Sequence, residues 1–471
     1  MKHQRHILNL MALFVSVLLL IWLCGLAETT MLISYGNWMT AGEIFAFLTA
    51  NEYESSDVLN YCLRYVWPYW IVCSLIYLGI GVLVWWLTVV KNTRPSRYTA
   101  IGIIVVLAVP FALPGVNHSL LQEIACVVEQ VRNIEKHQND NDGFRYNACR
   151  QEPVADKEIY VLSLGESVRY KNLSLNGIYN RETTPLLKNR IDLVLYSDYY
   201  ANATLTQHAL PMLMTDARTY DFEKHFSRKT IAAAFSEAGF KTALVSHRAQ
   251  LMNNGYHDYL AKDFDTIIFV SHDSLIAPEL SNLANKHEKL FAVTHYLGNH
   301  IFYTNRTADC LQWRPDYNAD PKAKSDSLFL NAYDNSLLYT DRLLNKEIET
   351  LKQTKTISAW LFVSDHGEYI SPKVSGHGHT YHPTKEEYHV PLMVWYSDEY
   401  KEAYPEKVAN LIKHKDEPVC ADHVFWSVLD MADIRIDSTL HQDGLSVFGD
   451  TLLPHRRTLL LPDGRSVLTL D

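Results

Sequence analysis

Carboxylate and imidazole side chains follow several apolar segments of this sequence, and both groups are common metal ligands. Glu166 comes directly after the apolar segment 159–164, and Asp365 and His366 come directly after the segment 359–363. Two further segments, "THYLGNH" and "SGHGHTYHP", supply His295, His300, His377, His379 and His382. A single histidine of this kind is more often a surface or core residue, but this combination of ligands favours a zinc site.

The apolar segments alternate with helical patterns, which indicates an α/β domain with a central, mostly parallel sheet flanked by helices. Helices are expected at 230–238 and 331–352. The expected strands are 159–164, 193–196, 242–246, 266–270, 290–294, 359–363 and 391–396. Because parallel strands end at the same edge of a sheet, the carboxylates and histidines that follow them are expected to converge there.

A metal site that attacks phosphorus or sulfur esters also needs a nucleophile, and hydroxyl side chains are available in this chain. Ser167 is adjacent to Glu166, while Thr204 and Thr206 precede Pro211 in "NATLTQHALPMLMT". That stretch is expected to begin a helix, whose first N–H groups are suited to holding a phosphate. The chemistry of the residues alone does not rank the three hydroxyls.

The composition narrows the class of protein. A chain of 471 residues that is 48% hydrophobic can form more than one domain and bury a large core. Its net charge of -10 argues against a general nucleic-acid binder. The seven cysteines form no CxxC pair, so there is no zinc-finger or redox motif, and any disulfide pairing stays open.

Three segments near the N-terminus have the length and composition of transmembrane helices. Residues 7–27, 67–90 and 98–116 contain no Asp, Glu, Lys or Arg, and each is close to the roughly 20 residues that cross a bilayer. The alternative for the first segment is a cleaved signal peptide, because Lys2 and Arg5 precede it. Since two further apolar segments follow, a membrane domain of three spans over residues 1–117 is the better interpretation.

Basic residues predict the orientation of these spans. Lys2 and Arg5 precede the first span, and Lys91, Arg94 and Arg97 lie between the second and the third, so both ends are expected in the cytoplasm. Three crossings then put the rest of the chain outside the inner membrane, in the periplasm of a Gram-negative bacterium. This part is expected to comprise a helix and linker at 118–155 and a catalytic domain at 156–471.

Four motifs together resemble the phosphoethanolamine transferases that modify lipopolysaccharide, a family of the alkaline phosphatase superfamily with a sulfatase-like domain. The motifs are "GESVRYKNLSLNGIYNRETTPLL" from Gly165, "NAYDNSLLYTD" at 331–341, "VSDHGE" at 363–368 and "HVPLMVWY" at 389–396. The resemblance covers roughly residues 156–435, and it is specific because separate motifs occur in order. The chain departs from the family in having fewer spans and no cysteines within 201–214.

The resemblance implies a role for each residue of the metal site. Glu166, Thr206, Asp365 and His366 would bind a catalytic Zn²⁺ ion, and Thr206 would also be the nucleophile. His300 and His377 would complete the active site, where a second zinc ion is an open alternative, and His379 is the alternative to His377. Four residues are further candidates for binding the substrate: His247, Arg248, Asn254 and His379.

The resemblance also implies a reaction. Phosphoethanolamine would pass from phosphatidylethanolamine to Thr206, and then to lipid A or another envelope glycan at the membrane surface. The alternatives are a membrane-anchored phosphodiesterase or sulfatase-like hydrolase, and a transferase of another phospholipid head group. A non-catalytic lipid-binding membrane protein is less expected, because Glu166, Thr206, Asp365 and His366 are all present.

Overall fold

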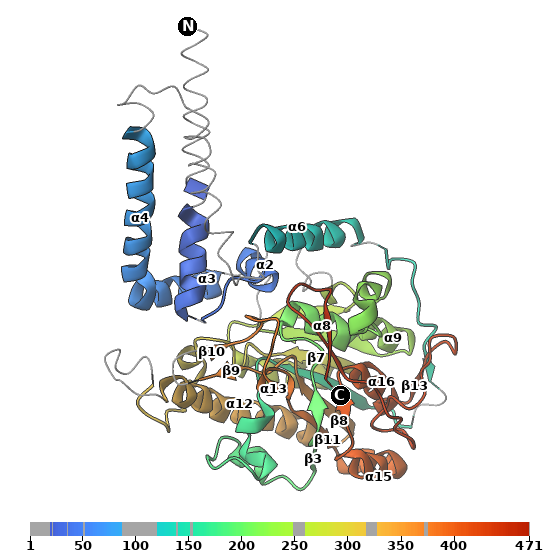
Figure 1. Cartoon of the computed structure of the whole chain (residues 1–471). Coiled ribbons are helices and arrows are strands. Elements are labelled where there is room, and N and C mark those ends of the chain that lie inside the picture. The colour runs from blue at the N-terminus through green and yellow to red at the C-terminus, as the bar shows by residue number, and fades with distance from the viewer. Residues whose placement is uncertain are drawn as a thin grey trace. The chain divides into compact units, whose positions relative to one another are not determined.

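The computed structural model describes most of the chain. The described residues are 19–20, 22–34, 36–49, 52–86, 120–137, 140–150, 154–247, 260–316, 327–371 and 375–470. The chain divides into two compact units, residues 1–128 and 129–471 (Figure 1).

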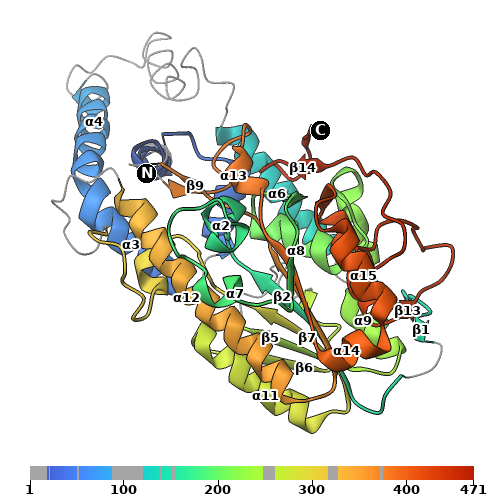
Figure 2. The same ribbon diagram turned by 90° about the horizontal axis from the view of Figure 1, so that it is seen from below.

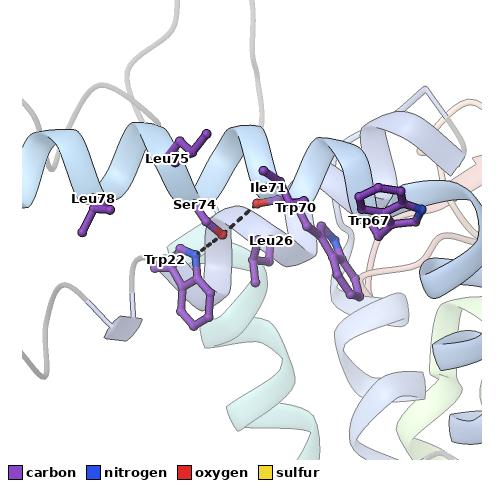
Figure 3. Close-up of a pocket in the computed structure, with 8 residues that line it drawn as sticks. All are labelled: Trp22, Leu26, Trp67, Trp70, Ile71, Ser74, Leu75 and Leu78. Atoms are coloured by element: carbon purple, nitrogen blue, oxygen red, sulfur yellow. Dashed lines mark hydrogen bonds between the residues drawn. The ribbon is translucent and has the colours of Figure 1, made fainter.

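The first unit is helical. Helices α2 (Ala41–Thr49) and α3 (Glu52–Tyr61) precede a π-helical turn, Cys62–Val66, which continues directly into α4 (Trp67–Trp85). An apolar pocket lies between α4 and the helical segment that contains Trp22 and Leu26 (Figure 3). Polar contacts join the two elements there: the indole nitrogen of Trp22 donates to Ser74 Oγ, and that of Trp70 donates to Thr30 Oγ1, both at 3.0 Å.

The predicted membrane spans are only partly covered by the described residues. Most of 7–27 and all of 98–116 lie outside them, while 67–90 corresponds to α4 over its first 19 residues. In the described part of the chain, no helix combines the length and the apolar character that a bilayer crossing requires. The three spans, and the domain boundaries near residues 117 and 155, therefore stay predictions.

The second unit is built on a seven-stranded sheet with the order β3-β11-β8-β2-β7-β5-β6. These strands confirm all seven that the sequence predicts: β2 (Glu158–Gly165), β3 (Leu193–Leu195), β5 (Lys241–Ser246), β6 (Thr266–Phe269), β7 (Lys289–His295), β8 (Ile357–Ser364) and β11 (Leu392–Tyr396). Every residue of β2 and β8 is buried, as expected for central strands covered on both faces.

The sheet is mixed rather than uniformly parallel. The neighbours β8, β2, β7, β5 and β6 are parallel, but β11 runs antiparallel to both β8 and β3. The described residues between β8 and β11 form only short elements: β9 (Tyr369–Ile370), β10 (Ser375–Gly376) and α13 (Lys385–Tyr388). Because no long crossover helix carries the chain back across the sheet, β11 starts from the edge where β8 ends.

Helices cover both faces of the sheet. Helices α11 (Ile276–Lys286) and α12 (Leu328–Gln353) pack side by side on one face (Figure 2). Besides α13, the other α-helices in the described part of this unit are α7 (Pro185–Lys188), α8 (Thr206–Met214), α9 (Ile231–Glu237), α14 (Asp398–Ala403), α15 (Pro405–His414), α16 (Asp422–Met431) and α6 (Leu120–His137), which crosses the boundary between the units. Helices α9 and α12 confirm the two predicted helices.

Short strand pairs fix the segments around the sheet. They are β1 (Cys149–Arg150) with β13 (Ile434–Arg435), β4 (Tyr199–Tyr200) with β12 (Val419–Cys420), and β14 (Thr458–Leu460) with β15 (Val467–Thr469). The β4–β12 pair is parallel and holds the segment that leads into α8. No disulfide bond joins any two of the seven cysteines, all of which lie in the described residues.

Candidate active site

The ends of two neighbouring strands and the start of one helix bring four candidate ligands together. Glu166 follows β2, Asp365 and His366 follow β8, and Thr206 is the first residue of α8. The hydroxyl of Thr206 lies 3.1 Å from Glu166 Oε2 and 3.2 Å from His366 Nε2. His366 Nε2 is in turn 3.2 Å from Glu166 Oε1 and 3.3 Å from Asp365 Oδ2.

This set of atoms fits a bound zinc ion. Its oxygen and nitrogen donors are buried and are separated by roughly the distance between neighbouring ligands of a tetrahedral zinc site. Burial alone would lower the pKa of His366, but the carboxylates of Asp365 and Glu166 outweigh it and raise that pKa to about 10. The two carboxylates thus create a strong preference for a cation at this position.

A strained turn presents Glu166. Its neighbour Ser167 has a left-handed backbone with φ of 60°, which costs a residue other than glycine roughly 1–2 kcal/mol. Tyr333, on α12, stabilises the turn because its hydroxyl donates to Ser167 O at 2.7 Å and accepts from Arg169 N at 2.8 Å. Gly165 is required before the turn, since a Cβ there would lie 2.4 Å from the ring of Phe362.

Backbone contacts orient the other two ligands. Asp365 Oδ1 accepts from Ser167 N at 3.1 Å and from His366 N at 2.7 Å, so it ties the ends of β2 and β8 together. His366 Nδ1 lies 2.8 Å from Gly367 O. Because Nδ1 is the donor in that contact, the neutral form of the ring that binds a metal keeps its lone pair on Nε2, facing Thr206, which is the usual arrangement of a metal-binding histidine.

Three histidines lie next to the candidate metal ligands. Ligand atoms of Glu166, His300 and His377 lie within 4.8 Å of one another. The rings of His377 and His366 have centroids 3.9 Å apart, and those of His377 and His300 are 6.0 Å apart. The ring centroid of His379 lies 6.2 Å from that of His377. The structure therefore brings both predicted histidines and the alternative to one place.

Glu368 is an acidic residue of this site that the sequence analysis did not assign. Its carboxylate is buried, lies 2.9 Å from His377 Nδ1 and accepts from the hydroxyl of Tyr303 at 2.7 Å. Burial raises its pKa to about 7. Its position in the motif "VSDHGE", two residues after His366, was the feature of the sequence that could have indicated its place in the site.

Of the three other candidates for binding the substrate, the structure describes only His247. His247 Nδ1 lies 2.9 Å from Asp273, whose carboxylate also accepts from Leu297 N and Gly298 N in the loop that leads to His300. Arg248 and Asn254 lie outside the described residues.

Two other histidines named by the sequence analysis lie elsewhere. His295, in β7, is buried with its Nδ1 3.3 Å from Ser246 Oγ. His382 is exposed. Neither belongs to a potential metal-binding group in the described part of the chain.

Known proteins resemble this chain in sequence. A protein-family model described as Sulfatase matches residues 158–434. YhbX of Escherichia coli K12, described as a candidate transferase, is 30% identical over 250 residues, which are 51% of this chain and 43% of YhbX. Phosphoethanolamine transferase EptC of Escherichia coli K12 is 23% identical over 472 residues, covering 88% of this chain and 79% of EptC. The match to YhbX thus spans less than half the length of that relative.

Solved structures share the fold. The C-terminal periplasmic domain of EptC from Escherichia coli, in complex with Zn, has a TM-score of 0.60 at 20% identity and covers 68% of this chain and 93% of that domain. The integral membrane protein lipooligosaccharide phosphoethanolamine transferase A (EptA) from Neisseria meningitidis has a TM-score of 0.65 at 19% identity and covers 91% of this chain and 86% of EptA.

These relatives confirm the resemblance to phosphoethanolamine transferases that the motifs indicate. The family model begins with the first residue of β2 and ends beyond β11, so it contains the whole central sheet and all four residues of the candidate metal site. Because it covers more than half of the chain, the chain belongs to the sulfatase family.

Proposed function

We propose that this protein is a zinc-dependent phosphoethanolamine transferase with a covalent intermediate on Thr206. The donor would be phosphatidylethanolamine, and the acceptor would be lipid A or another group of lipopolysaccharide. The observation that carries the proposal is the position of the Thr206 hydroxyl, in contact with both Glu166 and His366 at the first residue of α8. The names of relatives such as EptC support the choice of phosphoethanolamine.

The residues have distinct roles in the proposed first step. A zinc ion bound by Glu166, Asp365 and His366 would lower the pKa of the Thr206 hydroxyl. Thr206 Oγ1 loses its proton to water and attacks the phosphorus, and the bond between phosphorus and the diacylglycerol oxygen breaks. The N–H groups of the first turn of α8 are positioned to stabilise negative charge on the phosphate oxygens.

His377 is the residue that we expect to protonate the leaving oxygen. Its Nδ1 is held by Glu368, so its other ring nitrogen is the one available for proton transfer. In the second step an acceptor oxygen attacks the same phosphorus, the bond to Thr206 Oγ1 breaks, and the acceptor's proton passes to the protein. His300 lies beside His377 and is positioned to bind the transferred phosphate.

The membrane location belongs to the same proposal. Both the phospholipid donor and a lipid A acceptor are confined to a bilayer surface, so an enzyme anchored in the inner membrane with a periplasmic domain would meet them at high effective concentration. The predicted N-terminal spans and the likeness to the integral membrane protein EptA support this arrangement.

Mass spectrometry of the full-length protein tests the proposal. The wild type is incubated with phosphatidylethanolamine that carries a labelled head group, and a phosphoethanolamine adduct on Thr206 with release of diacylglycerol is expected. Thr206→Ala should lose both. Thr204→Ala is the matched control, because Thr204 is also buried and lies only two residues away; it should retain both. Zinc-loaded wild type that releases no diacylglycerol would rule out this donor, and release without an adduct or acceptor product would favour a hydrolase.

A further inference from the structure

A second group of metal-binding side chains lies outside the site around Thr206. Cys420 ends β12, Asp422 begins α16, and His455 lies in the segment that leads into β14. One sulfur, oxygen or nitrogen atom from each of them lies within 4.8 Å of the other two. We propose that Cys420, Asp422 and His455 form a structural binding site for a thiophilic divalent cation, with zinc as the best match.

The ligand types and their burial support zinc. Thiolate, carboxylate and imidazole are its usual protein ligands, and structural zinc sites are closed to solvent. Cys420 is 1% exposed and the side chains of Asp422 and His455 are 1% and 15% exposed. His455 Nε2 already lies 2.6 Å from Asp422 Oδ2, so these two ligands need to separate only slightly to share an ion.

Asn202 provides an independent indication of a missing ligand. Its side chain is 1% exposed, and its Oδ1 has no hydrogen-bond partner among the described residues. The amide nitrogen of the same group donates to Asp422 Oδ1 at 2.5 Å, which places the whole amide at the cluster. An orphaned buried carbonyl oxygen is costly, and coordination to a cation held beside Asp422 would remove that cost.

The local charges are compatible with this assignment. Arg218 Nε lies 3.9 Å from Asp422 Oδ2 and is a cation that faces the site. Because a metal-bound cysteine is a thiolate, the Cys420 thiol releases its proton to solvent on binding. A thiolate and a carboxylate then balance the two charges of the ion, and Arg218 faces an approximately neutral site.

A cation at this position would stabilise the segment that carries the nucleophile. Asn202 precedes Thr206 by only four residues. The backbone of the same segment pairs with Cys420 through β4 and β12, and Leu460 N donates to Asn202 O at 2.7 Å. The ion would therefore join three chain segments directly beside the start of α8.

Cobalt substitution distinguishes this site from the catalytic site. The catalytic ligands are oxygen and nitrogen atoms, so only a site that contains cysteine gives a thiolate-to-cobalt charge-transfer band in the near ultraviolet. Full-length protein is stripped of metal and reloaded with Co²⁺, and the wild type should show this band. Cys420→Ser should lose it and bind one equivalent less zinc, whereas Cys310→Ser, which changes another buried cysteine, should keep both.

Two further variants keep the test decisive. Glu166→Gln should lose the catalytic metal but retain the charge-transfer band and one equivalent of zinc. His455→Gln leaves the thiol in place and should weaken cobalt binding at least tenfold, with an unchanged circular dichroism spectrum, so it substitutes for Cys420→Ser if that variant does not fold. A wild type without the band, a band that persists in Cys420→Ser, or undiminished cobalt binding in His455→Gln would overturn the proposal.

Discussion

Removing one hydroxyl group on α12 should disturb the metal site although it touches no metal ligand. In Tyr333→Phe, Ser167 O and Arg169 N both lose their partner, at 2.7 and 2.8 Å in the wild type. Tyr333 is fully buried, so water does not readily replace the hydroxyl. An unsatisfied buried group costs about 1–3 kcal/mol, so the two groups should together lower the free energy of unfolding by about 2–6 kcal/mol.

The same change should lower activity, because the turn that it loosens carries Glu166. Loss of a group that orients a metal ligand typically reduces metal affinity or activity by about 10- to 100-fold. Thermal unfolding of the purified full-length protein and its zinc content are measured together with transfer of a labelled head group. Tyr339→Phe is the matched control on the same helix, because the Tyr339 hydroxyl contacts Ser274 and, at an exposed position and 3.4 Å, His272, but not the turn that carries Glu166. If Tyr333→Phe unfolds and reacts like Tyr339→Phe, the turn does not depend on the hydroxyl and the reasoning is refuted.

Three other predictions address the site and its support. Gly367→Ala should lower the free energy of unfolding by about 1–3 kcal/mol and reduce the zinc content, because a Cβ there would lie 2.0 Å from the backbone oxygen of Glu386. The control in thermal unfolding is Gly143→Ala, since a Cβ at Gly143 meets no atom within 4 Å. Burial raises the pKa of Asp341 to about 6, above the roughly 4 of an unfolded chain, so folding stability should fall by at most about 3 kcal/mol as the pH rises from about 4 to 6. Asp341→Asn should flatten that part of a stability–pH profile. Chelation of metal should abolish transfer, and added Zn²⁺ should restore it; full activity after verified removal of metal would contradict the assignment of the site.

The sheet was predictable because its strands carry an unusually simple pattern. Central strands such as β2 and β8 are buried on both faces and consist of nearly continuous apolar residues, which distinguishes them from the amphipathic helices between them. Neighbouring parallel strands end at the same edge of a sheet. Once the strands are known, this rule alone predicts that Glu166, Asp365 and His366 lie close together. The direction of β11 was not predictable, because an apolar pattern does not indicate which way a strand runs.

The loop after Glu166 shows where the sequence was uninformative. Several of its polar residues bind α12 rather than the metal site. Asp334, on that helix, accepts from Asn172 at 2.9 Å, from the Tyr179 hydroxyl at 2.6 Å and from Arg181 at 2.7 Å. A single sequence does not show whether a basic residue such as Arg181 binds a phosphate or anchors a loop. The structure shows that it anchors the loop, because its partner Asp334 is buried on α12.

The two candidate metal sites differ in predictability for a physical reason. The ligands around Thr206 follow strands of one sheet, so a general property of parallel sheets predicts their meeting. Cys420 and His455 are 35 positions apart in the sequence, and they meet only because the C-terminal segment packs beside β4 and β12. That packing depends on individual contacts such as the one between Leu460 N and Asn202 O, which no periodicity indicates. A metal bound by Cys420, Asp422 and His455 would add bonds between segments that the central sheet does not hold together. Such bonds would help to keep Thr206, which follows in the same segment as Asn202, in place.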